Sequence, residues 1–140
     1  MKGPILAVDP GEKRIGVAIS DPSASLARPL TVIRHVARLV DAAAVASLAA
    51  ENHAVSIIVG QALDSEGNVG PAGRKAARFA EALRSQTEIP VELWDESGST
   101  QRAREIQIRL GVPRQKRKGH LDEHAAAAIL QSYLDENWSS

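Results

Sequence analysis

The chain has 140 residues, with 17 basic side chains, 17 acidic side chains and no cysteine. This length suits one hydrophobic core, so we expect a single domain over residues 1–140. A net charge of zero gives no argument for nucleic-acid binding, and the lack of cysteine excludes a disulfide framework and a thiolate zinc site. No apolar run approaches the roughly 18 residues of a membrane span, and the N-terminal run is too short for a signal peptide. We therefore expect a cytoplasmic protein without membrane contact.

The first part of the chain predicts three strands and a helix. Apolar runs over residues 5–9 and 14–21 are joined by a tight Pro-Gly turn, which predicts a hairpin. Residues 29–35 predict a third strand, with Pro29 at its start, where a missing N–H does least harm. The alanine-rich segment 36–52 has apolar residues at helical spacing.

The second part predicts strands that alternate with helices. Residues 55–60 form a continuous apolar run, typical of a strand covered on both faces. The remaining expected elements are a helix over 71–85, a strand over 91–95, and helices over 100–110 and 121–136. This order predicts an α/β fold. Its mixed five-stranded sheet combines a three-strand antiparallel meander with two parallel strands and is flanked by helices.

Acidic residues stand at the ends of three predicted elements. Asp9 ends the first strand, Asp95 and Glu96 end the fifth, and Asp122 opens the last helix. Each has a structural alternative, because Asp9 suits a turn before Pro10 and Asp122 suits a helix N-cap. Sites in such sheets form at the carboxyl ends of parallel strands. Carboxylates there suit Mg²⁺, with Mn²⁺ as a substitute, and metal ions clamp the reacting oxygens of a phosphodiester.

A basic segment lies between residues 101 and 120, where Glu105 is the single acid among seven lysines and arginines. A solvated loop is one interpretation of this segment. Beside a carboxylate cluster, phosphate binding is the better one. The side chains expected to hold nucleic-acid phosphates are Arg14, Arg114, Lys116, Arg117 and Lys118. Aromatic residues are scarce, which argues against a stacking platform for single strands.

Two other motifs offer weaker alternatives. His120, Asp122 and His124 contain ligand types that suit a transition metal, but His120 precedes the expected helix, which spoils the spacing. Asp9-Pro-Gly with Gly16 is similar to the phosphate hairpin of actin-like ATPases and sugar kinases. Those proteins need a second similar domain, which 140 residues do not supply.

Four motifs, in order from about Ile5 to Leu134, resemble the YqgF-type family of RuvX-like Holliday junction resolvases, also described as pre-16S rRNA nucleases. They are DPGEKRIGVAISD, IIVGQALDSEGNVGPAGRKAARFAEAL, ELWDESGSTQRARE and KGHLDEHAAAAILQSYL. The resemblance implies an RNase H-like fold and metal-dependent cleavage of nucleic acid. It implies Asp9, Glu96 and Asp122 as the catalytic and metal-binding positions. The implied partner is pre-rRNA, in ribosome biogenesis, or branched DNA, in recombination. The choice between these two substrates stays open, and so does the question of a homodimer.

The chain departs from the family pattern at several positions. Ser97 replaces the arginine that follows Asp-Glu, and Ala62 replaces the proline of the Gly-x-Pro-Leu segment. Ala125 stands where RuvC-like resolvases carry a second aspartate, three residues after Asp122. These departures support an alternative from another class, a weakly active or non-catalytic nucleic-acid-binding factor of ribosome assembly on the same fold.

Overall fold

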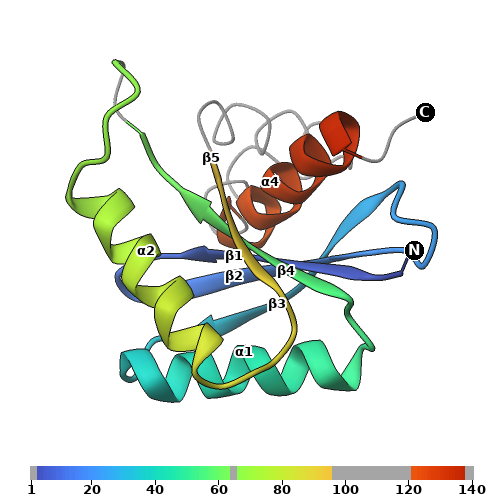
Figure 1. Ribbon diagram of the computed structural model, residues 1–140, viewed down its shortest axis with the longest axis horizontal. Helices are drawn as coiled ribbons and strands as arrows, with labels where there is room; N and C mark the ends of the chain where they lie inside the picture. Colours follow the sequence, from blue (N-terminus) through green and yellow to red (C-terminus); the bar gives the residue numbers. More distant parts are fainter. Residues whose placement is uncertain (1–2, 64–65, 96–120, 138–140) are drawn as a thin grey trace.

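The computed structural model describes residues 3–63, 66–95 and 121–137 (Figure 1). Its strands are β1 (Ile5–Pro10), β2 (Arg14–Ser20), β3 (Ala27–Arg34), β4 (Ser56–Gln61) and β5 (Val91–Asp95). Its helices are α1 (Arg38–Glu51), α2 (Pro71–Arg84) and α4 (Leu121–Asn137). The helix expected over residues 100–110 lies outside the described residues.

The strands form one five-stranded sheet in the order β3-β2-β1-β4-β5. β1 pairs antiparallel with β2, and β2 pairs antiparallel with β3. On the other side of β1, the β1–β4 and β4–β5 pairs are parallel. The predicted meander with two parallel strands is therefore confirmed, and β1 lies at the centre of the sheet.

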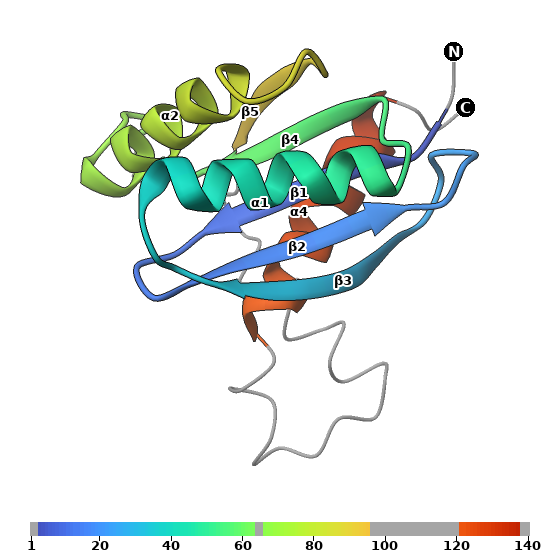
Figure 2. The same ribbon diagram turned by 90° about the horizontal axis from the view of Figure 1, so that it is seen from below.

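Helices cover both faces of the sheet, α1 and α2 on one and α4 on the other (Figure 2). Strand alternation divides the core accordingly, because successive side chains point to opposite faces. Leu6 and Val8 pack in the cluster beneath α1 and α2, whereas Ile5 and Ala7 pack in the cluster beneath α4. Within the described ranges, no helix has both the length and the apolar character to span a bilayer.

The third strand differs from its prediction. It begins at Ala27, so Pro29 lies inside the strand and not at its start. Pro29 is tolerated there because β3 is an edge strand. The register between β2 and β3 also shifts between Val17 and Ala18, next to the Ala18–Pro29 pair. A proline removes one ladder hydrogen bond, and an edge strand with an irregularity needs fewer of them.

The loop between β2 and β3 is organised by one carboxylate. Asp21 accepts hydrogen bonds from the backbone N–H of Ser25 at 2.8 Å and of Leu26 at 3.2 Å, and from the Ser23 hydroxyl at 2.8 Å. The Ser25 N–H is the largest of the causes that hold the pKa of Asp21 well below its usual range.

We expect Asp21→Ala to lower the melting temperature at neutral pH, and we expect this difference from the parent to become smaller as the pH falls. A depressed folded-state pKa stabilises the protein above the unfolded value, near 4, and this stabilisation is lost as the pH falls below it. Thermal melts of parent and variant between about pH 7 and pH 2 measure the difference. Glu12→Ala, which removes an exposed acid from another turn, is the control. A difference independent of pH would contradict the role of the charge.

Candidate active site at the end of the central strand

Asp9 lies near the end of β1, where it is half-buried. Its strand partner on β2 is Gly16. The parallel register between β1 and β4 ends with the pair Val8–Val59, and one further step along both strands brings Gly60 beside Asp9. Alternation from Ile5 and Ala7 places the Asp9 side chain on the face that α4 covers.

The Asp9 carboxylate is thus flanked by glycine on both neighbouring strands. Side chains that pair across adjacent strands stand about 5 Å apart on the same face of a sheet. The space beside a strand residue is therefore normally filled by the side chains of its neighbours. With glycine on each side, no side chain of β2 or β4 stands beside the carboxylate on this face. A half-buried carboxylate at this position is a ligand type that suits a hard divalent cation.

The turn after Asp9 is closed by its own backbone. The N–H of Gly11 donates to the carbonyl oxygen of Arg14 at 2.9 Å. A Cβ at Gly11 would stand 2.6 Å from that oxygen, so this turn requires glycine. Arg14 is exposed at the start of β2, at the same end of the sheet as Asp9. The turn therefore keeps the predicted phosphate contact near the predicted metal ligand.

Asp122 is the second residue of α4, and the structure describes its backbone position. Later in this helix, Gln131 Oε1 accepts a hydrogen bond from the Ala27 N–H at 2.9 Å. Ala27 pairs with Ser20, whose hydroxyl accepts from the Ile5 N–H at 2.8 Å, so Gln131 lies at the end of the sheet where β1 begins. α4 starts towards the other end, where β1 finishes (Figures 1 and 2). The helix therefore begins at the end of the sheet that carries Asp9.

Strand alternation places Asp95, the last residue of β5, relative to Asp9. Val91 and Leu93 pack in the cluster beneath α1 and α2, and Trp94 packs in the cluster beneath α4. The same alternation assigns Asp95 to the α1/α2 face, opposite Asp9. Of the two acids that the sequence offered, Asp95 is therefore the poorer partner for Asp9.

Several predicted site residues lie outside the described residues. They are Glu96, Arg114, Lys116, Arg117, Lys118 and His120. Within the ranges that the structure describes, no group of three histidine, aspartate or glutamate side chains is arranged to hold a metal. His124, the remaining member of the suggested transition-metal set, is buried in α4.

A model of one protein family matches residues 3–136, which is nearly the whole chain, and its description is "RuvX: Holliday junction resolvase". The chain belongs to the RuvX family. A relative from Caldanaerobacter subterraneus subsp. tengcongensis is 39% identical, over 97% of this chain and 99% of the relative. One from Syntrophus aciditrophicus is 43% identical, over 94% of this chain and 87% of the relative. Both carry the name "Putative pre-16S rRNA nuclease".

Solved structures show the fold of this RuvX protein. RuvC of T. thermophilus in complex with a Holliday junction substrate matches with a TM-score of 0.59 and 17% identity, over 96% of this chain and 95% of that one. The fowlpox virus resolvase in complex with Holliday junction DNA matches with a TM-score of 0.60 and 12% identity, over 97% and 99%. With the mixed sheet flanked by helices, these matches confirm the RNase H-like fold that the motifs implied.

The sequence interpretation missed the glycines that flank Asp9. Gly16 and Gly60 were visible as members of two motifs, but their position on either side of one carboxylate depends on strand order and register. The detectable signal was a glycine in each of two strands whose interior positions otherwise hold β-branched residues and alanine.

Proposed function

We propose that this RuvX protein is a metal-dependent nuclease that hydrolyses phosphodiester bonds in structured nucleic acid in the cytoplasm. We favour the 5′ end of pre-16S rRNA as the substrate, with branched DNA as the second choice. The observation that carries the proposal is the Asp9 carboxylate, held between two glycines at the end of the central strand. The names of the relatives support the choice of RNA.

In this proposal, Asp9, Glu96 and Asp122 hold Mg²⁺, for which Mn²⁺ can substitute. The donor set is suitable, because hard divalent cations prefer carboxylate oxygens and keep positions for water and substrate phosphate. A bound ion would activate water as the nucleophile and stabilise charge on the phosphate oxygens. Arg14, exposed beside the turn that follows Asp9, orients the neighbouring phosphates.

The deciding experiment is a cleavage assay on a 16S rRNA precursor with a 5′ extension and on a four-way DNA junction. Each substrate is incubated with the protein in Mg²⁺ and in EDTA. We expect magnesium-dependent cuts in the precursor. The alternative, a non-catalytic assembly factor, predicts binding without cuts in either condition. Ala125 favours this alternative, because its position on α4 supplies no further ligand after Asp122.

The basic segment leads to a prediction about salt. If Lys116, Arg117 and Lys118 contact phosphates, neutralising all three should flatten the log–log dependence of duplex affinity on salt by roughly two to three units, since each contact contributes about 0.9. Titrations in EDTA at several salt concentrations measure the slope without cleavage. A variant that neutralises the exposed Arg74 and Arg78 of α2 is the control. An unchanged slope would show that the segment does not contact the duplex.

A further inference from the structure

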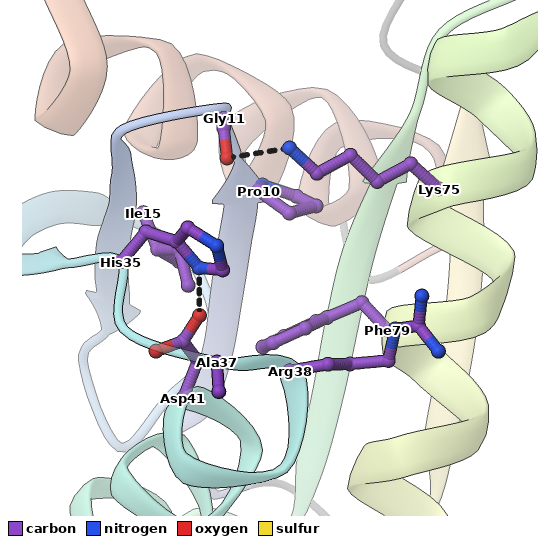
Figure 3. A pocket seen from close by; sticks show the side chains of 9 residues that line it. All are labelled: Pro10, Gly11, Ile15, His35, Ala37, Arg38, Asp41, Lys75 and Phe79. Atoms are coloured by element: carbon purple, nitrogen blue, oxygen red, sulfur yellow. Dashed lines mark hydrogen bonds and ion pairs between the residues drawn. The ribbon is translucent and has the colours of Figure 1, made fainter.

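A pocket of about 260 Å³ lies on the α1/α2 face of the sheet, beside the turn that follows β1 (Figure 3). Pro10, the neighbour of Asp9 in the chain, lines it, so the pocket opens on the opposite face of the sheet from Asp9. Part of its wall is apolar and consists of Pro10, Ile15, Ala37 and Phe79. The rest is formed by Gly11 and by ionisable side chains from three different segments of the chain.

Lys75 reaches into this pocket from α2. It is half-buried, and its ammonium group donates to the carbonyl oxygen of Gly11 at 3.0 Å. Over the described ranges, neither Lys75 nor the second cation of the pocket, Arg38, has a carboxylate within salt-bridge distance. A half-buried ammonium held by one neutral carbonyl is incompletely compensated, and it keeps further N–H groups for a ligand.

The single acid of the pocket is fully engaged. Asp41 is buried, with 2% exposure, and its Oδ1 accepts from the Val36 N–H at 3.0 Å. Its Oδ2 contacts Nδ1 of His35 at 2.5 Å. Because an ionised carboxylate only accepts, Nδ1 carries the hydrogen. Figure 3 shows the other nitrogen of this ring, Nε2, turned towards the interior of the pocket.

The pocket therefore carries a positive charge excess. Lys75 and Arg38 contribute two full charges, and the one negative charge, on Asp41, is directed at its own hydrogen-bond donors. An anion bound beside the Lys75 ammonium would meet its remaining N–H groups and no free carboxylate oxygen. The apolar side chains of Ile15 and Phe79 offer contact to an uncharged body attached to that anion.

We propose that this pocket binds a phosphate monoester carried on a sugar, either a free nucleoside 5′-monophosphate or the 5′-phosphate end of a nucleic-acid strand. Lys75 and Arg38 donate to the phosphate, Nε2 of His35 accepts from a hydroxyl of the sugar, and Ile15 with Phe79 contacts the sugar. The volume lies just below the range of about 300–1,000 Å³ for small-molecule sites, which suits one nucleotide. The proposal does not rest on cleavage activity.

The test is binding of adenosine 5′-monophosphate to the full-length protein in EDTA, measured by calorimetry, with adenosine as the ligand without phosphate. We expect the parent to bind the monophosphate and not adenosine. Lys75→Gln should weaken binding about tenfold or more, as loss of a hydrogen bond from a charged group does. Arg74→Gln, which removes the adjacent but outward positive charge on α2, should bind within about twofold of the parent.

A second arm identifies the source of the phosphate. Short RNA strands with a 5′-phosphate or a 5′-hydroxyl are compared, again in EDTA. A preference for the phosphorylated strand that Lys75→Gln abolishes assigns the pocket to strand ends, and monophosphate binding alone assigns it to free nucleotides. Arg38→Gln, at an exposed position, repeats the test if Lys75→Gln unfolds. The proposal is overturned if the parent binds neither probe better than its phosphate-free partner, or if the variants bind as the parent does.

Discussion

Replacing Asp9 by asparagine is expected to slow magnesium-dependent cleavage by about a hundredfold or more while nucleic-acid binding stays near normal. The size follows from losing a metal ligand, since metal stabilisation of a developing charge contributes several kcal/mol to the transition state. Binding persists because it depends on phosphate contacts, which this substitution does not touch. Single-turnover cleavage and binding in EDTA, measured on the same substrate, separate the two effects.

The same variant has a thermal signature. Carboxylates crowded together without a metal repel each other, so removing one charge should keep or raise the melting temperature in EDTA. The increase that Mg²⁺ gives the parent should disappear, because a ligand stabilises only the state that binds it. Glu12→Gln is the matched control, since it removes an exposed negative charge from the adjoining turn.

The alternative role for Asp9 makes a different prediction. If its side chain serves only to cap the turn at Gly11, asparagine replaces it with little loss, because Asn and Asp are similar caps. Cleavage and the magnesium-dependent increase in melting temperature would then survive in Asp9→Asn. Intact cleavage would therefore end the metal-site proposal, whatever the stability of the variant.

The sheet was predictable because the burial of each strand determines which of its positions are apolar. β4 is a continuous apolar run because Ile57 and Val59 face one helical layer while Ile58 faces the other. The start of β3 was not predictable in this way. An edge strand with an irregular register accepts Pro29 in its interior, and both of those properties come from the neighbouring strand.

The candidate site was predictable only in part. Asp9 was identified because a carboxylate within an apolar strand is costly without compensation. Asp9 and Asp95 lie on opposite faces of the sheet because of strand order and register. Neither of these can be deduced from the composition of a single strand. The contacts of the pocket that Lys75 and His35 line depend on how α1 and α2 pack, because these two residues lie 40 positions apart in the chain. Helix packing of this kind leaves no local pattern.

Gly60→Ala is expected to reduce cleavage by about a hundredfold while the fold and its stability change little. The added methyl group would stand on the α4 face of β4, directly beside the Asp9 carboxylate. Alanine suits a strand interior better than glycine, so we expect the substitution to leave the backbone of β4 unstrained. The methyl instead occupies the space proposed for the ion and the substrate phosphate, and a displacement of about 1 Å at a reacting centre costs about that factor.

The control for this variant is Gly70→Ala, because a Cβ at Gly70 meets nothing within 4 Å and its φ of −95° is open to any residue. Cleavage by Gly70→Ala should equal that of the parent, and both variants should keep the melting temperature in EDTA. Loss of the magnesium-dependent increase in melting temperature in Gly60→Ala alone would tie the lost cleavage to the metal. If Gly60→Ala cleaved as fast as the parent, the position beside Asp9 on the α4 face of β4 would not be part of the reaction. The two glycines beside Asp9 would then serve backbone packing alone.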